Sequence, residues 1–289
     1  MHRLRSDLSR GEEGDVRTAV STLDLREPRS LRDALVMLDE EPGLIPLAGA
    51  TDLFVALNDG TLPGSRFLNL WGLAALRRIS LRGEVLSIGA LATFTSIARS
   101  RAVRARAPML AAAALQVGGI QIQNRGTIGG NIANGSPAGD SLPVLSALDA
   151  QVVLKSVEGE RRVRFAEYYT GYRKSVRRAD ELIIAVEIDA VEGKQWFRKV
   201  GTRAAQAISK VVMAGVRAPR PRLAIGSVGA TVIRLERVEA ALAAGHSVDD
   251  AVEILEREIS PIDDLRSSAV YRRRVAGNLL RRFWEDTSK

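Results

Sequence analysis

The chain has 289 residues, 46% of them hydrophobic and 26% charged, with no cysteine and only two histidines. This composition supports a large core in one big domain or two ordinary ones. It excludes disulfides and cysteine-ligated iron–sulfur clusters within the chain, and two histidines are too few for a metal site built on them. The formal net charge of +8 fits nucleic acid, an anionic cofactor or an acidic partner. The basic residues concentrate between Arg161 and Arg222 without a Lys/Arg block or a nucleic-acid-binding motif, so no nucleic-acid partner is expected.

The first 18 residues are polar and charged, and we expect them to form a mobile tail. They lack the apolar segment of a secretory signal. The longest uninterrupted apolar runs, such as Met109–Leu115, are too short to span a bilayer. We therefore expect a cytoplasmic protein with no membrane span.

Capping and turn signals predict the elements of the front half. Ser30–Asp33 has a capping-box pattern, and the leucines around it predict a helix that ends at Glu41–Gly43. A short apolar strand then leads to a turn at Gly49 and to a helix that begins at Thr51 or Asp52. A hairpin and two helices are predicted next, at Ile79–Ala90, Thr93–Ser100 and Ala107–Gly119.

The back half is predicted to contain strands followed by helices. A hairpin turns at Glu158 and Gly159, and the second of three late helices begins with a capping box at Ser247–Asp250. The hairpin and strands cover Gln151–Phe165, Glu181–Asp189, Lys194–Gly201 and Pro221–Gly229, and the helices cover Leu235–Gly245, Ser247–Ile259 and Ser267–Asp286. A boundary near residues 190–195 divides a mixed domain, 19–192, from a strand-then-helix domain, 193–289. The absence of strict βαβ alternation favours an α+β fold.

Two glycine-containing segments indicate a ligand. Arg125–Leu145 contains five glycines, and Pro46–Leu53 has a strand, a glycine turn and a helix start. Glycine permits tight turns, and it also lets backbone N–H groups approach an anion. The longer segment lacks both the lysine of a phosphate-binding P-loop and the glycine spacing of a Rossmann turn. Two separate anion-binding segments in one domain suggest a ligand with a diphosphate and two ends, which describes a dinucleotide.

Four stretches carry a resemblance to a known family: "AGATDL", "GTIGGNIANGSPAGDSLPVLSALDA", "GYRKSVRRADELI" and "FRKVGTRAAQAIS". In this order they resemble the FAD-binding subunit of molybdenum hydroxylases, a family that includes xanthine dehydrogenase and carbon monoxide dehydrogenase. The similarity covers roughly residues 19–285. It implies a two-subdomain FAD-binding fold of the PCMH type, followed by a C-terminal antiparallel sheet with helices.

The resemblance also implies which residues hold the FAD. In this family two glycine loops wrap the diphosphate and the ribityl chain of the FAD. The two glycine-containing segments of this chain correspond to these loops. By position, Asp140 accepts a hydrogen bond from a sugar hydroxyl, Ile183 packs on the isoalloxazine, and Lys199 lies near the flavin. The implied cofactor-binding residues are Pro46, Leu47, Ala48, Gly49, Ala50, Thr51, Asp52, Leu53, Val117, Thr127, Ile128, Gly129, Gly130, Asn131, Asn134, Asp140, Ile183 and Lys199. Structural roles stay open for some of them, since Asp140 also fits a helix cap and Lys199 a solvated strand residue.

The function implied by the resemblance is electron transfer within a larger enzyme. Because the chain has no cysteine, the 2Fe-2S clusters and the molybdenum cofactor are expected in an iron–sulfur subunit and a molybdopterin-binding subunit of a hetero-oligomer. No catalytic side chain is named, because the flavin carries the redox chemistry. We also expect the basic run Arg161–Arg222 to dock a partner subunit.

One departure and two alternatives accompany this interpretation. NAD-reducing members of the family commonly have acidic residues where this chain has Ala204–Ser209, which argues against NAD as the electron acceptor. A stand-alone flavin oxidoreductase of the same superfamily is one alternative, and it predicts turnover by this chain alone. A non-enzymatic basic scaffold is the other, and it predicts no bound flavin.

Overall fold

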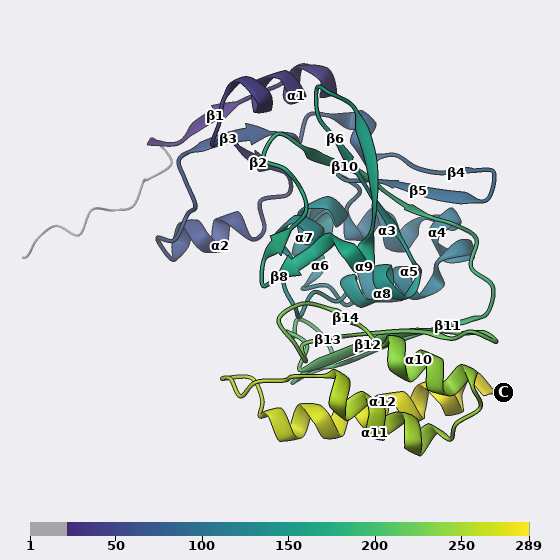
Figure 1. The fold of residues 1–289 in the computed structure, drawn as a ribbon. Helices are drawn as coiled ribbons and strands as arrows, with labels where there is room; N and C mark the ends of the chain where they lie inside the picture. The colour runs from purple at the N-terminus through teal and green to yellow at the C-terminus, as the bar shows by residue number, and fades with distance from the viewer. Residues whose placement is uncertain (1–21, 289) are drawn as a thin grey trace, which may run out of the picture.

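The computed structural model of the chain describes residues 22–288, so the tail predicted over residues 1–18 lies outside the described residues. Besides a two-stranded sheet within Tyr169–Ser175, three larger sheets are arranged from one end of the molecule to the other, and the C-terminal helices cover the last of them (Figure 1). None of the helices within residues 22–288 is long and apolar enough to cross a membrane.

The first sheet is small and parallel, with its strands in the order β1-β3-β2. Its helix α1 begins at Ser30, whose Oγ accepts a hydrogen bond from the amide of Asp33 (3.1 Å). Leu35 and Leu38 of that helix pack against Leu68 of the sheet. The elements are β1 (Asp24–Arg26), α1 (Leu31–Glu40), β2 (Ile45–Leu47), α2 (Leu53–Asn58) and β3 (Arg66–Asn69).

The second sheet is antiparallel and has the order β4-β5-β10-β6-β7. Short helices pack on it and share one apolar core with it. The elements of this layer are η2 (Ala74–Arg77), β4 (Ile79–Arg82), β5 (Val85–Gly89), α3 (Phe94–Arg99), α4 (Arg101–Arg106), α5 (Pro108–Ala114), α6 (Ile120–Arg125), α7 (Ile128–Asn134), α8 (Leu142–Ala147), β6 (Gln151–Lys155), β7 (Glu160–Arg164), α9 (Phe165–Tyr168), β8 (Tyr169–Gly171), β9 (Lys174–Ser175) and β10 (Leu182–Ile188).

The third sheet is antiparallel and is buried on both faces. Val212 and Ala214 of β12 belong to the core of the second layer, whereas Val211 and Met213 pack with Phe283 and the C-terminal helices. This alternation follows from the two-residue period of a strand. The elements are β11 (Lys194–Val200), β12 (Val211–Arg217), β13 (Arg222–Gly226), β14 (Ile233–Arg234), α10 (Glu236–Ala243), α11 (Val248–Glu258) and α12 (Ala269–Ser288).

The predicted α+β class and the C-terminal antiparallel sheet with helices are confirmed. The capping box at Ser247 and Asp250 is present with both of its hydrogen bonds. The sequence prediction missed α4 and α6, and it treated as a loop the segment that forms α7. Because the core extends across residue 193, the division into domains 19–192 and 193–289 stays a prediction.

Replacing Phe283 by Ala is expected to lower the free energy of unfolding by about 3–5 kcal/mol. Phe283 is fully buried, packs edge-to-face against Trp196, and closes the lower face of the third sheet. Urea unfolding measures the change. Val270→Ala on the same helix is the control, since Val270 is 78% exposed and its loss should change stability by no more than about 0.5 kcal/mol. Equal effects of the two substitutions would contradict the assignment of α12 to the core.

Candidate functional site

A cavity of about 1010 Å³ lies where the three layers meet. It is lined by the turn between β2 and α2, by α6 and α7, by the start of β10, and by residues 203–208 before β12. All the residues predicted to bind the cofactor line this cavity except Leu47, Ile128 and Lys199. Leu47 lies in β2 opposite Asn69, and Ile128 is fully buried in α7.

The turn between β2 and α2 presents free backbone donors. Within residues 22–288, the amides of residues 49–53 donate to no acceptor. Ala50 has a left-handed backbone (φ 63°), which is uncommon for a residue with a Cβ. Left-handed residues within a run of free amides are typical of backbone concavities that bind anions. This turn therefore has the properties of an anion site.

Gly49 is required by contact between two segments of the protein. A Cβ on Gly49 would lie 1.9 Å from the carbonyl oxygen of Arg125, at the end of α6. Gly129 is similarly constrained, because its Cβ would lie 2.7 Å from the Cβ of Ala90. These glycines let chain segments touch one another, and the cavity wall is built from the segments that meet in this way.

The second predicted loop contains the helix α7, and the first amides of this helix are already used. Thr127 is the N-cap of α7, and its Oγ1 accepts from the amide of Gly130 (3.1 Å). The amides of Ile128 and Gly129 donate to the carbonyls of Ala92 (3.1 Å) and Ala90 (2.9 Å). The expectation of free backbone donors is therefore wrong for residues 128–130, and cofactor binding by this segment stays a prediction. Tertiary contacts supply caps that the glycine-rich sequence alone does not reveal.

Side chains of α7 contribute in place of its backbone. Asn134 donates through Nδ2 to Asp52 Oδ1 (2.9 Å), which ties α7 to the turn with the free amides. Asn131 Oδ1 accepts from Ser141 Oγ (2.7 Å). Burial raises the pKa of Asp52, and the nearby Arg173 guanidinium opposes this shift. These two asparagines hold the polar end of the cavity together.

Asp140 lies in the cavity wall with both carboxylate oxygens occupied. Oδ2 accepts from Lys199 Nζ (2.6 Å) and Oδ1 accepts from Ser209 Oγ (2.5 Å). Burial raises the pKa of Asp140, and the Lys199 ammonium counteracts it. Asp140 does not cap the following helix, because the N-cap of α8 is Ser141, with no side-chain cap bond. Lys199 is not a solvated strand residue either, since its side chain is only 7% exposed.

The sequence prediction missed part of the wall that comes from the segment before β12. Gln206 has a left-handed backbone (φ 53°), and its side chain occupies the space beside Gly119 that a Cβ would fill. Ala207 and Ile208 also line the cavity, as do Gln121 and Ile122 of α6. The pair Gly118-Gly119 is the available signal in the sequence, but it fits the end of the helix predicted over Ala107–Gly119 equally well.

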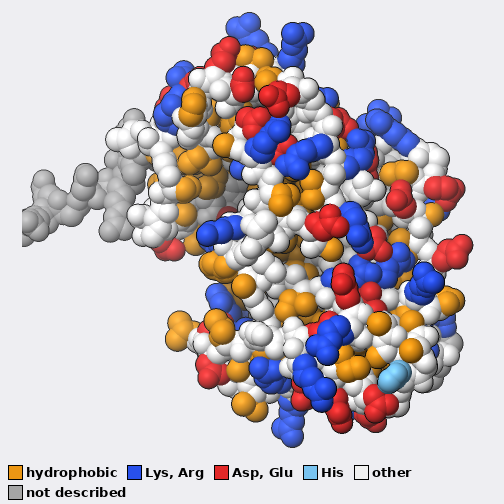
Figure 2. Space-filling model, viewed as in Figure 1, with side chains coloured by type: hydrophobic (Ala, Val, Ile, Leu, Met, Phe, Trp, Pro, Cys, Tyr) orange, Lys and Arg blue, Asp and Glu red, His pale blue; other side chains and the backbone are white. Residues whose placement is uncertain are grey.

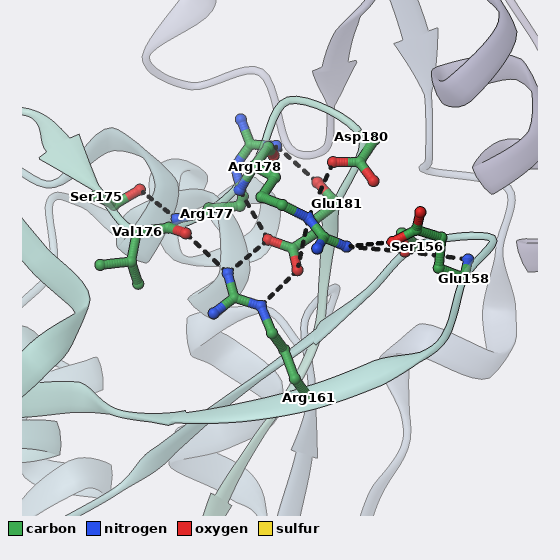
Figure 3. Close-up of polar contacts among 9 residues, drawn as sticks. All are labelled: Ser156, Glu158, Arg161, Ser175, Val176, Arg177, Arg178, Asp180 and Glu181. Carbon is green, nitrogen blue, oxygen red and sulfur yellow. Dashed lines mark hydrogen bonds and ion pairs between the residues drawn. The ribbon is translucent and has the colours of Figure 1, made fainter.

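The start of β10 is held in place by a buried carboxylate (Figure 3). Glu181, 1% exposed, accepts from Arg161 Nε (2.6 Å) and from the amide of Arg178 (2.7 Å). Hydrogen bonding to the Arg161 guanidinium lowers the pKa of Glu181. Leu182 and Ile183 follow directly and line the cavity. The bonds around Glu181 therefore fix where these apolar side chains lie.

Part of the basic run is engaged in ion pairs within the protein. Lys and Arg side chains alternate with Asp and Glu over the face shown in Figure 2 and do not gather into one basic patch there. Paired arginines between 161 and 222 include Arg161 with Glu181, Arg162 with Glu187, Arg164 with Glu167, Arg178 with Glu158, and Arg222 with Asp149. Docking of a partner by this run therefore stays a hypothesis.

Comparison with known proteins identifies the family. The FAD binding domain in molybdopterin dehydrogenase matches residues 21–189, and the CO dehydrogenase flavoprotein C-terminal domain matches residues 196–287. The chain belongs to the FAD-binding medium subunits of the molybdenum hydroxylase family. The predicted family, its oxidoreductase class and its cofactor FAD are thereby confirmed.

Individual relatives match most of the chain. The glyceraldehyde dehydrogenase medium chain of Sulfolobus acidocaldarius is 31% identical over 85% of this chain and 91% of that protein. The nicotinate dehydrogenase FAD-subunit of Eubacterium barkeri is 35% identical, over 64% of each protein. A solved carbon monoxide dehydrogenase from Hydrogenophaga pseudoflava superposes with a TM-score of 0.85 at 26% identity, covering 90% of this chain and 95% of that one.

Replacing Gly49 by Ala is expected to lower the free energy of unfolding by about 2 kcal/mol. The new methyl group would overlap the Arg125 carbonyl and push the β2–α2 turn away from α6. Thermal unfolding measures the change. Gly72→Ala is the control, because a Cβ there meets nothing within 4 Å. A G49A protein as stable as wild type would contradict the contact.

Replacing Glu181 by Gln is expected to cost about 2 kcal/mol near neutral pH, because hydrogen bonds to a charged group are lost. The folded-state pKa of Glu181 lies below its usual value of 4.5, so its contribution is present above that value and is lost as the pH falls. The acid side of the stability curve should therefore be flatter in E181Q than in wild type, as urea unfolding across this range would measure.

Glu158→Gln is the matched control for this substitution. Glu158 pairs with the same Arg178, but its side chain is 73% exposed, so its loss should change stability by no more than about 0.5 kcal/mol. Identical pH slopes for wild type and E181Q would contradict the role of the buried carboxylate.

Proposed function

We propose that the chain holds FAD in this cavity and serves as the electron-transfer flavoprotein subunit of a molybdenum-dependent dehydrogenase. The observation that carries the proposal is the run of free amides at residues 49–53 on the wall of a cavity of about 1010 Å³. Unpaired backbone donors in a cavity are costly unless a ligand accepts from them. A diphosphate supplies such acceptors, and its negative charge suits backbone N–H groups.

The rest of the cavity also fits a dinucleotide of this kind. Its volume is at the upper end of the range for small-molecule sites, about 300–1,000 Å³. Ala48 to Leu53 form its polar end, whereas Leu182 and Ile183 offer an apolar wall on which a flat ring system can pack. Asn134 is hydrogen-bonded to Asp52 of this polar end and also lines the cavity, so both offer polar groups to a sugar chain. Val117 also lines the cavity and offers apolar packing to such a ring system.

FAD, when bound, supplies the redox chemistry, and the chain supplies position and electrostatics. The free amides orient the cofactor by its diphosphate. The apolar side chains after Glu181 exclude water from the ring end. No acid, base or nucleophile from this chain is assigned a chemical step.

The proposed partners follow from what this chain lacks. Because it has no cysteine, iron–sulfur clusters cannot be ligated by its thiolates. We assign the clusters and the molybdenum cofactor to an iron–sulfur subunit and a molybdopterin-binding subunit of a hetero-oligomer. Its relatives are the medium chains or FAD subunits of dehydrogenases named for carbon monoxide, glyceraldehyde and nicotinate. Such chemically different names support a role remote from the substrate.

The segment before β12 supports an acceptor other than NAD. Residues 201–209 contain no acidic side chain, and Arg203 donates to the carbonyls of Ala205 (3.1 Å) and Gln206 (3.2 Å) within the same segment. Carboxylates that could accept from a nicotinamide ribose are therefore missing from this segment.

Purified chain is expected to bind FAD and to be stabilised by it. With FAD at about 100 times its dissociation constant, the free energy of unfolding should rise by about 2.7 kcal/mol, or about 5 °C in melting temperature. Riboflavin, which has no diphosphate, should bind at least about tenfold more weakly, since it leaves the amides of residues 49–53 without an acceptor. Differential scanning fluorimetry and quenching of flavin fluorescence measure both effects. Equal affinity for the two flavins, or no affinity for FAD, would contradict the proposal.

A further inference from the structure

A buried polar group connects the cavity wall to the C-terminal part of the chain. Lys199 at the end of β11 and Ser209 before β12 both bind the carboxylate of Asp140. The side chains of Lys199 and Asp140 are each 7% exposed, and Ser209 is 1% exposed. Of the three, only Asp140 lines the cavity. Lys199 is thus separated from the cavity by the residue it binds.

The same ammonium group also holds a second part of the wall. Lys199 Nζ donates to the carbonyl oxygen of Gln116 (2.8 Å). Gln116 directly precedes Val117, Gly118 and Gly119, which line the cavity. One cation therefore joins the Asp140 turn to the Gln116–Gly119 turn and sets how far apart these two walls lie.

The hydrogen-bonded chain continues away from the cavity. The carbonyl of Ser209 accepts from Ser227 Oγ (3.0 Å), and the carbonyl of Ser227 accepts from Arg272 Nη1 (2.8 Å). Arg272 belongs to α12, is 5% exposed, and also binds Asp264 (2.7 Å). The Asp140 turn is therefore anchored through buried side chains to the last helix of the protein.

We propose that Lys199 is a positioning residue of the FAD site, acting through Asp140 and the Gln116–Gly119 turn without touching the flavin. The inference rests on the proposed function, because it takes FAD as the ligand of the cavity. It differs from the direct role near the flavin that the family resemblance implies for Lys199. The geometry supports an indirect role, since the hydrogen bonds of the ammonium go to two protein groups and Lys199 does not line the cavity.

The test compares Lys199→Met, Asp140→Asn and the double variant in the full-length chain. K199M should weaken FAD binding about tenfold, because it leaves a buried carboxylate unpaired and frees the two walls. In the D140N background the same substitution should change FAD affinity much less, since the side chain at position 140 then carries no charge that needs a counter-ion. The affinity of K199M should also recover as the pH is lowered and Asp140 becomes protonated, whereas that of wild type should not. The midpoint potential of the bound flavin should stay unchanged in K199M.

Two control variants separate positioning from loss of stability. Arg234→Met removes another largely buried cation, which pairs with Asp149 and Glu239, and none of these three residues lines the cavity. It should lower the melting temperature without changing FAD affinity. Lys199→Arg keeps the charge and should recover most of the affinity, and it provides a folded protein if K199M fails to fold.

Three outcomes would overturn the inference. One is a K199M protein that binds FAD as tightly as wild type. Another is an equal loss of affinity in the wild-type and D140N backgrounds together with a shifted flavin potential, which would show direct action of Lys199 on the cofactor. The third is a wild-type chain that binds no FAD, which would overturn the proposed function first and this inference with it.

Discussion

The unpaired amides between β2 and α2 are the constraint on which the cavity depends. Buried backbone donors are almost always paired, so a run of free ones persists only where a ligand or solvent accepts from them. The surrounding protein keeps the run in place: Gly49 rests on the Arg125 carbonyl, and Asn134 holds Asp52 at the other end of the turn. The two glycine-containing segments thus have different tasks, since one offers donors and the other supports it.

Local patterns predicted much of the fold because their causes are local. The hairpin at residues 151–164 and the capping box at Ser247 depend on neighbouring residues, and both are present. Helix α7 depends on carbonyls of Ala90 and Ala92, nearly 40 residues away in the chain, so the glycine-rich sequence alone favoured a loop. In such segments, tertiary hydrogen bonds override the conformational propensity of the local sequence.

The candidate site, too, could be predicted from the sequence only in part. The resemblance located Pro46–Leu53 and most of α7, and the structure brings them together at the cavity. It could not show that Asp140 and Lys199, 59 positions apart, share a hydrogen bond, nor that Gln206 fills the space beside Gly119. Those pairings are set by how β11 and β12 pack against the second layer. The periodicity of hydrophobic residues in the sequence does not reveal this packing.

The charged residues of the chain also have roles within the protein. A net charge of +8 suggests an anionic partner, yet several of the arginines between 161 and 222 are bound to carboxylates of the same chain. One of these carboxylates, Glu181, stands directly before the apolar wall of the cavity. Its arginine partners act on the site through the residues they hold, which is the role we propose for Lys199. The C-terminal sheet therefore does more than cover the core: without it Asp140 would have neither the ammonium nor the hydroxyl that its buried charge requires. Removing residues 193–289 should consequently disturb the cavity itself, even though most of the residues that line it lie in the first part of the chain.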